Sequence, residues 1–476
     1  MTKLKLWSVA VAVALTSSAA MAAGEAKNVI FFLGDGYGPV TYTAARIYMV
    51  KEEGSLITDT MPYTARVKTY SLDAQTTDSA PSMAAYTTGV KTRNDVIGMN
   101  AATLAIPYKP SAVMVANNNP ADGGMTSVNN AKNNCPASGN GAASANVIEM
   151  AKLKNKATGV VTTARLTHAT PAATYAHVCH RDAEFDISAQ AVPGGAGYNG
   201  LLGTGGIDVL MGGARSYWTP FDNTSNKTGR PDGRNLTTEM VAKGYTYATD
   251  RASMMSAPTA AGSKILGLFS PTSHMTYELD RNPATEPSLA DMTAKAIDVL
   301  SKNSNGYYLM VEGGRIDHAL HDTNAKRALE EAKAFDAAIR VALSKVDLSN
   351  TLIVVTADHD HTMAFNGYGK RGSDILGNNI NYADGQPSLD ADGNAYPTLV
   401  FGNGANRPDL RSSSSNGIVT GNDYLQEVAI RLGGKGSETH GGGDVMLFSI
   451  GAGSKTFKGT IDNTKVFSLI KDAAGY

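Results

Sequence analysis

The chain has 476 residues, of which 42% are hydrophobic and 18% are charged, so it can bury a large core. Its formal net charge is −1 and it has no block of basic residues, which argues against a nucleic-acid-binding surface. The length would allow two or three domains, but one large α/β domain with long insertions fits equally well.

Residues 1–22 are predicted to be a secretory signal peptide. Two lysines precede an apolar run over residues 6–15, and Ala20-Met21-Ala22 is a small-x-small cleavage site. This run is too short to cross a bilayer, and no other run is long and apolar enough to do so. We therefore expect cleavage after Ala22, a mature chain of residues 23–476 with net charge −3, and a periplasmic or secreted location.

Apolar runs that end in polar or glycine-rich turns alternate along the mature chain with helical patterns. Continuous apolar runs of this length are typical of strands buried on both faces of a parallel sheet. The alternation predicts an α/β fold: a central, mostly parallel sheet sandwiched by helices, with the active site at the C-terminal ends of the strands. Strands are expected at 28–33, 158–163, 307–311 and 351–356, and helices at 144–154, 289–301 and 323–345.

Ser79 is expected at the first position of a helix. Asp78 is a good N-cap, Pro81 belongs in a first turn, and Gly89 is a plausible stop. At a helix N-terminus the free N–H groups and the helix dipole favour an anion, so a serine there could attack phosphorus. Taken alone, the stretch fits a simple capping role better.

The cysteines and the histidines give two further constraints. Cys135 and Cys179 are the only cysteines, and they could form a disulfide or remain two free thiols. Of the nine histidines, most lie in clusters next to aspartates, and His274 stands apart from them. The clusters are His168, His177 and His180; His318 and His321; His359 and His361; His440 lies in a glycine-rich loop.

The stretch that follows the strand at 307–311 is the strongest single indication of chemistry. Gly313 and Gly314 allow a sharp turn between a strand and a helix. Asp317 and His321 are four residues apart, so they share one face of that helix. A carboxylate and an imidazole placed in this way can bind a divalent ion such as Zn²⁺. The alternative is a solvated helix start with an N-terminal acid.

Residues 366–416 are rich in Gly, Asn, Asp and Ser and show weak periodicity. We interpret them as an insertion within a single catalytic domain of residues 23–476. A lid or a subunit-contact region would have this character.

Five motifs, in this order along the chain, resemble those of the alkaline phosphatases. The similarity extends from about residue 28 to about residue 450, and the stretches 315–318 and 167–171 are closest to the animal-like branch. The motifs are Gly34-Asp35-Gly36-Tyr37-Gly38, Asp78-Ser79-Ala80, Val311-Glu312-Gly313, Thr356-Ala357-Asp358-His359 and Glu438-Thr439-His440.

The resemblance implies two Zn²⁺ and one Mg²⁺ per subunit. It also implies that Ser79 is the nucleophile, that Arg181 clamps two phosphate oxygens, and that the protein is a homodimer. The implied ligands are Asp317, His321 and His440 for one zinc; Asp35, Asp358, His359 and the Ser79 oxygen for the other; and Asp35, Thr170 and Glu312 for the third ion.

Histidines at two positions depart from one bacterial branch of the family, which has an aspartate and a lysine there. These are His168 and His318, and they make the third site less rich in oxygen. Mg²⁺ is still expected, with Zn²⁺ or Co²⁺ as alternatives. We expect His168 to act on this site through a water and His318 to face the phosphate pocket or solvent. His361 belongs either to the surroundings of the metal ligands or to the turn alone.

The function expected from these residues is a secreted, metal-dependent phosphomonoesterase that acts through a phosphoserine at alkaline pH. Its substrates would be phosphate monoesters, with inorganic phosphate as product. Arg181 favours monoesters because its guanidinium needs two unesterified oxygens. Two alternatives remain: a phosphodiesterase of the same superfamily, and a non-catalytic exported metal-binding protein.

Overall fold

The computed structural model describes residues 24–105, 111–116, 125–130, 135, 139–407, 409, 411–412, 415–433 and 437–476. The signal peptide predicted at 1–22 lies outside the described residues. In the part of the chain that the structure describes, no helix combines the length and the apolar character needed to span a membrane.

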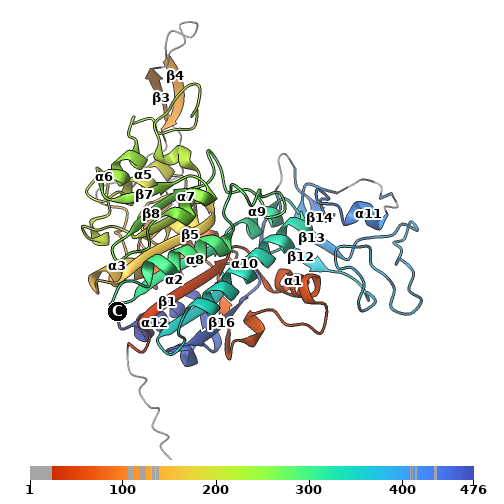
Figure 1. Cartoon of the computed structure of the whole chain (residues 1–476). Coiled ribbons are helices and arrows are strands. Elements are labelled where there is room, and N and C mark those ends of the chain that lie inside the picture. Colours follow the sequence, from red (N-terminus) through yellow and green to blue (C-terminus); the bar gives the residue numbers. More distant parts are fainter. Residues whose placement is uncertain are drawn as a thin grey trace, which may run out of the picture.

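Within the described residues, ten strands form one sheet in the order β17-β2-β16-β10-β1-β9-β5-β6-β8-β7 (Figure 1). Four predicted strands are neighbours at its centre and run parallel: β10 (Thr351–Ala357), β1 (Asn28–Gly34), β9 (Tyr307–Gly313) and β5 (Ala157–Arg165). The antiparallel pairs are those that β16 (Val445–Gly451) makes with β10 and with β2 (Tyr63–Lys68). The predicted fold class is therefore confirmed. The remaining strands of this sheet are β6 (Val209–Gly213), β7 (Tyr245–Ala248), β8 (Lys264–Leu268) and β17 (Gly459–Asp462).

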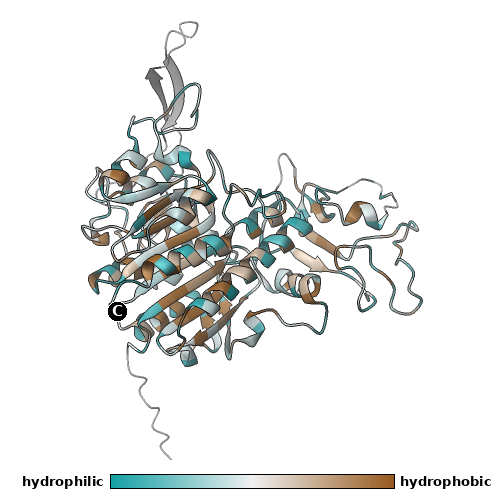
Figure 2. Ribbon diagram, in the orientation of Figure 1, coloured by the Kyte–Doolittle hydropathy of each residue, from teal (hydrophilic) through white to brown (hydrophobic). Residues whose placement is uncertain are grey.

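Helices cover both faces of the sheet, because alternate side chains of its central strands enter two separate cores. Phe31 and Leu33 pack toward α2 (Ser79–Thr88), α3 (Val147–Leu153) and α12 (Asn463–Ala474). Ile30 and Phe32 pack toward α1 (Pro39–Val50), α8 (Leu289–Leu300) and α10 (Ala325–Lys345). Burial on both faces explains why these strands are apolar throughout, as their brown colour in Figure 2 shows.

Short helices connect these layers. The α-helices are α4 (Ala169–Ala172), α5 (Glu184–Gln190), α6 (Leu236–Ala242), α7 (Arg251–Ser256), α9 (Arg315–His321) and α11 (Asn416–Val419). The 3₁₀ helices are η1 (Thr58–Thr60), η3 (Gly200–Leu202), η4 (Arg215–Trp218) and η5 (Ser454–Thr456).

In the described part of the chain, three smaller sheets lie outside the large one. β12 (Met363–Phe365), β13 (Leu399–Gly404) and β14 (Val428–Arg431) form a three-stranded sheet. The predicted insertion, 366–416, begins directly after β12, includes β13 and ends where α11 begins. β11 (Asp360–His361) pairs with β15 (His440–Gly441). β3 (Ser111–Ala116) and β4 (Met125–Asn130) form a pair that projects from the main body (Figure 1).

Cys135 and Cys179 form a disulfide, with their Cα atoms 5.3 Å apart. Of the two possibilities that the sequence leaves open, the structure therefore shows the bridge. It ties the chain beyond the β3–β4 pair to the segment that leads to Arg181.

Candidate active site

The acidic side chains of the site meet because three central strands end at one edge of the sheet. In the parallel register Gly34 of β1 is paired with Ala357 of β10 and with Gly313 of β9. Asp35 and Asp358 directly follow this level, and Glu312 lies just before it. Gly36 has φ +65°, and a Cβ there would lie 2.4 Å from the His361 ring, so the turn after Asp35 requires glycine.

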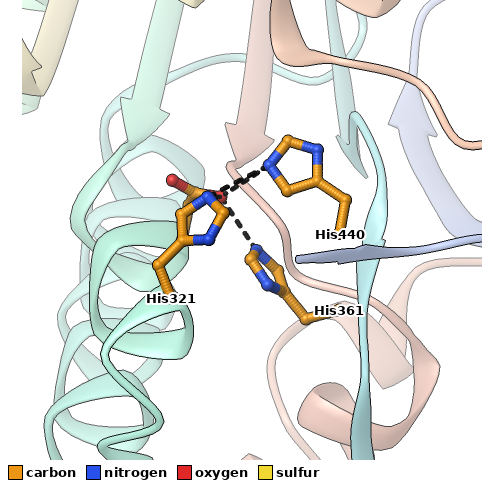
Figure 3. Close-up of side chains that lie close together, drawn as sticks. His321, His361 and His440 are labelled. Carbon is orange, nitrogen blue, oxygen red and sulfur yellow. Dashed lines mark hydrogen bonds and ion pairs between the residues drawn. The ribbon is translucent and has the colours of Figure 1, made fainter. Parts of the chain in front are cut away.

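The first metal-binding group consists of one carboxylate and converging imidazoles. His321 Nε2 lies 3.3 Å from Asp317 Oδ1, and His440 Nε2 lies 3.4 Å from the same oxygen. The two Nε2 atoms are 3.2 Å apart. Figure 3 shows His321, His361 and His440 turned toward one shared carboxylate.

The partners of the other ring nitrogens determine which of these histidines can bind a metal. His321 Nδ1 lies 2.6 Å from the carbonyl of Glu438, and His440 Nδ1 lies 2.9 Å from the carbonyl of Thr77. A carbonyl only accepts, so each Nδ1 carries the proton and each Nε2 presents a lone pair. Two lone pairs and a carboxylate oxygen that face one another at these distances fit a divalent cation between them.

His361 lies in the same group, but its two ring nitrogens both face carboxylates. Nε2 is 2.8 Å from Asp317 Oδ1 and Nδ1 is 2.6 Å from Glu438 Oε2. Burial opposes a charge on this ring, but the two carboxylates outweigh burial and raise the pKa of His361 to about 10. His361 therefore donates to Asp317 instead of presenting a lone pair to an ion.

The second group is Asp35, Asp358 and His359, and all three residues are buried. His359 Nε2 lies 3.3 Å from Asp35 Oδ1 and 3.5 Å from Asp358 Oδ2. His359 Nδ1 faces the carbonyl of Asp360 at 3.2 Å, so Nε2 again presents a lone pair. His359 Nε2 is also 3.9 Å from Asp317 Oδ1, which places the two groups side by side.

The third group shares Asp35 and adds Glu312 and His168. Burial raises the pKa of Glu312 to about 8, and the nearby hydroxyls of Thr162 and Thr170 act in the opposite direction. Arg181 Nη2 lies 2.9 Å from His168 Nε2, and because arginine only donates, His168 Nε2 accepts and Nδ1 carries the proton. His168 in this state can donate to a water at the third site but cannot bind an ion through Nδ1.

The carboxylates of these groups fit bound cations on electrostatic grounds. Burial and the neighbouring Asp358, Asp317 and Glu312 raise the pKa of Asp35 well above its usual range. Burial also raises the pKa of Asp358 to about 6. Acids this close together ionise jointly only next to positive charge. Several buried oxygens have no hydrogen-bond partner among the described residues, as expected of ion ligands: Asp35 Oδ2, Asp358 Oδ2, Glu312 Oε1 and Thr170 Oγ1.

Ser79 is the first residue of α2, and its hydroxyl points at the second group. Ser79 Oγ lies 3.1 Å from His359 Nε2 and 3.5 Å from Asp35 Oδ1. Asp78 is the N-cap, as its side chain accepts from the N–H of Ala80, and Gly89 ends the helix at φ +71°. The helix therefore begins and ends where the capping residues of the sequence indicate.

Arg181 lies beside Asp78, the residue before Ser79, and its guanidinium is held by two partners. Its guanidinium forms an ion pair with Asp78 and a hydrogen bond with His168. About one fifth of its side chain (19%) is exposed, so the guanidinium can still be reached from solvent. The structure thus brings every predicted site residue into one region.

His318 lies beside two other histidine rings. Its ring packs 3.8 Å from the ring of His274 and 5.3 Å from that of His168. Burial lowers the pKa of His318 to about 3, so the ring is neutral. His318 is thus part of a group of histidine rings next to the third metal-binding group, and 17% of its side chain is exposed.

The sequence reasoning missed two residues of the site. His274 stands alone in the sequence and meets His168 and His318 only through the fold, so no local signal could identify it. Glu438 belongs to the Glu-Thr-His motif, but no role was assigned to it. In the structure its carboxylate accepts hydrogen bonds from the His361 ring and from the N–H of Thr362. Its position two residues before His440, a predicted metal ligand, could have indicated that Glu438 lies at the site.

The comparisons with known proteins agree with this geometry. The family model described as alkaline phosphatase matches residues 26–476. The chain belongs to the alkaline phosphatase family. Alkaline phosphatase of Gadus morhua is 36% identical over 90% of this chain and 87% of its own length. The tissue-nonspecific isozyme of Homo sapiens is 35% identical over 94% of this chain and 84% of its own.

Solved structures show the same fold at lower sequence identity. Thermus thermophilus alkaline phosphatase superposes with a TM-score of 0.66 at 24% identity, over 96% of this chain and 92% of that one. The alkaline phosphatase from the Antarctic bacterium TAB5 superposes with a TM-score of 0.61 at 23% identity, over 95% and 99%.

Membership of this family settles the broad function. The chain is an enzyme with alkaline phosphatase activity, which hydrolyses phosphate esters and depends on metal ions. The non-catalytic metal-binding alternative is therefore set aside.

Proposed function

We propose that this enzyme is an exported phosphomonoesterase that works through a phosphoserine on Ser79, with two Zn²⁺ and one Mg²⁺ in each subunit. The observation that carries the proposal is the position of the Ser79 hydroxyl, at a helix N-terminus and 3.1 Å from His359 Nε2. A hydroxyl that points at the ligand group in this way can act as a nucleophile toward phosphorus. A serine that only capped the helix would direct its oxygen at the free N–H groups of the first turn.

The three groups of ligands support the assignment of the ions. Asp317, His321 and His440 offer the mixed nitrogen and oxygen donors that Zn²⁺ prefers, and so do Asp35, Asp358 and His359. Asp35, Glu312 and Thr170 offer only oxygen, which suits Mg²⁺. Magnesium is bound in the M3 site of a mutant TAB5 alkaline phosphatase. When bound, a pair of zinc ions would stabilise the attacking and the leaving oxygen of an in-line displacement.

The residues of the chain perform the remaining steps. Ser79 Oγ gives up its proton and bonds to the phosphorus while the bond from phosphorus to the ester oxygen breaks. The ester oxygen takes up one proton, and the alcohol of the substrate leaves. Water then attacks the phosphoserine, which releases inorganic phosphate and restores the Ser79 hydroxyl. Arg181 aligns two unesterified oxygens of the phosphate through its planar fork, which favours monoesters over diesters.

Export and dimerisation complete the proposal. The segment 1–22 has the composition of a cleavable signal peptide, and the disulfide of Cys135 and Cys179 suits a periplasmic or secreted protein. We assign subunit contact to the insertion at 366–416, within a single catalytic domain of residues 23–476.

Hydrolysis of p-nitrophenyl phosphate near pH 9 by wild type and by Ser79→Ala tests the nucleophile. We expect a loss of at least about a thousandfold in kcat for Ser79→Ala, because the covalent step disappears. Bis-p-nitrophenyl phosphate, measured in parallel, tests the substrate class and should be the poorer substrate. Equal activity of the two proteins would show that Ser79 is only a residue of the helix start and not the nucleophile.

A further inference from the structure

His177 lies outside the metal-binding groups, and both of its ring nitrogens face acceptors. Nδ1 is 2.6 Å from the carbonyl of Gly98, and Nε2 is 2.7 Å from Glu149 Oε1. A carbonyl and a carboxylate cannot donate, so each nitrogen must carry a proton. The ring is therefore an imidazolium, although only 10% of its side chain is exposed.

Glu149 is fixed as the negative partner of this ring. Its side chain completes a capping box at the start of α3, where Oε2 accepts from the N–H of Asn146 at 2.8 Å. Oε1 also accepts from Asn199 Nδ2 at 2.6 Å. Both carboxylate oxygens thus receive hydrogen bonds, which holds Glu149 ionised.

Among the residues that the structure describes, Glu149 is the charged group that faces the His177 ring. Gln190 of α5 bonds only the backbone of His177, at 2.9 Å to its N–H and 3.0 Å to its carbonyl. Burial disfavours a charge on His177, but Glu149 and the Gly98 carbonyl outweigh it and raise the pKa of the ring.

The contact between His177 Nδ1 and the Gly98 carbonyl depends on the backbone conformation of Gly98. Gly98 has φ +64°, and a Cβ there would lie 2.4 Å from the carbonyl of Ala176 and 2.8 Å from His177 Nδ1. Only glycine allows the two chain segments to approach so closely.

One of these two segments bears Arg181, and the other holds its backbone and its ion-pair partner Asp78. Ile97 and Val178 exchange two backbone hydrogen bonds of 3.0 Å each, and the N–H of Arg181 donates to the carbonyl of Asp95 at 2.8 Å. The N–H of Asp95 in turn donates to Asp78 Oδ2 at 3.0 Å. His177 therefore joins the segment that bears Arg181 to the segment that holds Asp78, the ion-pair partner of Arg181, by a hydrogen bond.

We propose that His177 is a positioning residue: as an imidazolium held between Glu149 and Gly98, it fixes the 95–98 and 178–181 segments so that Arg181 is aligned for phosphate. The proposal rests on the role of Arg181 given above. It adds a residue that touches neither phosphate nor metal but tunes phosphate affinity with pH.

The direction of the pH dependence follows from the hydrogen bonds. When the ring loses a proton, one nitrogen presents a lone pair to an acceptor and that contact is lost. The anchor is complete below the pKa of His177 and weakens as pH rises through it. Phosphate affinity falls in the same direction, which would ease product release at alkaline pH.

Phosphate inhibition constants and the KM and kcat for p-nitrophenyl phosphate, measured from pH 6.5 to 10.5, test this inference. Wild type is compared with His177→Gln. The control is Lys154→Gln, which also removes a positive charge but at an exposed position directly after α3. At pH 7 we expect His177→Gln to raise Ki and KM roughly tenfold, as for one lost charged hydrogen bond, and to change kcat by less than about twofold. The difference from wild type should shrink as pH rises through the pKa of the native ring, which Glu149 and the Gly98 carbonyl raise.

Double substitution separates this inference from the proposed function. In an Arg181→Ala background His177→Gln should have no further effect on Ki, because it acts through Arg181. Additive effects, or a Ki at pH 7 equal to that of wild type, would overturn the role of His177 alone. An unchanged Ki in Arg181→Ala would overturn the role of Arg181 instead. If His177→Gln does not fold, the NMR titration of the wild-type ring decides: a ring that is neutral at pH 7 refutes the proposal.

Discussion

At the scale of single residues, the partner of each histidine Nδ1 decides what the ring does. His321, His359 and His440 donate from Nδ1 to backbone carbonyls, and their Nε2 atoms are left to bind a metal. His361 faces carboxylates at both nitrogens and acts on Asp317 by donating to it. The residue type alone does not distinguish these roles, because the acceptors come from distant parts of the chain.

We predict that His361→Gln weakens zinc retention without removing a metal ligand. Glutamine can replace one donor to Asp317 or Glu438 but not both, and it carries no charge. Loss of such an orienting contact typically lowers metal affinity by about 10- to 100-fold. Chelator titration followed by metal analysis measures the loss, and added Zn²⁺ should restore activity. His180→Gln is the control, and equal zinc retention in all three proteins would contradict the prediction.

At the scale of elements, the sequence was sufficient for the centre of the sheet and insufficient for its edges. β1, β5, β9 and β10 are buried on both faces, so they are continuous apolar runs that can be recognised without tertiary information. The edge strand β17 and its neighbour β2 are partly exposed, and their pairing depends on contacts made only in the fold.

The residues of the site likewise fall into those that the sequence could indicate and those that only the fold brings together. Asp35 and Asp358 follow central strands and Glu312 lies near the end of one, so the sequence indicated that these acids meet at one edge of the sheet. The caps of α2 likewise placed Ser79 at a helix start. The roles of these residues as ligands and nucleophile were implied by the resemblance of their motifs. His274 reaches His168 only through tertiary packing, as do the acceptors of His361. These residues carry no signal in their own neighbourhood.

The long helix α10 contains a buried acid whose ionisation costs stability. Glu331 is only 4% exposed, and it accepts from the N–H of Glu278 at 2.6 Å. Burial raises the pKa of Glu331 to about 7. The folded state therefore binds this proton more tightly than the unfolded state, whose glutamate pKa is about 4.3. Stability is lost as pH rises between these two values, and the loss persists at alkaline pH.

We predict that Glu331→Gln stabilises the protein at pH 9. The amide oxygen of glutamine can still accept a hydrogen bond from the backbone N–H of Glu278, and no charge has to be buried at this position. We expect a gain of about 1–3 kcal/mol at pH 9 that shrinks toward zero at pH 5. Denaturant unfolding at the two pH values measures it, with Glu330→Gln on the same helix as control. A gain of the same size at both pH values would show that ionisation is not its cause.

At the scale of the whole molecule, the region around the small sheet exposes more apolar side chains than isolated surface residues would account for. Tyr368 is 85% exposed and Tyr382 is 67% exposed, and their rings lie 6.5 Å apart. Single exposed apolar residues are ordinary, but a gathering of them marks an interaction surface. The others in this region are Phe365, Leu389, Ile418, Leu425 and Ile430.

We predict that this region holds two subunits together. Wild type should have twice the mass of the chain in light scattering, and Tyr368→Asp should raise the dissociation constant at least about tenfold, because it places a charge in an apolar contact. Leu153→Asp is the matched control: Leu153 is 80% exposed but lies on α3, in the main body of the enzyme. A monomeric wild type, or equal effects of the two substitutions, would contradict the dimer. If Tyr368→Asp instead changes KM for p-nitrophenyl phosphate with no change in mass, the insertion acts as a lid, since only a lid couples this surface to substrate access within one subunit.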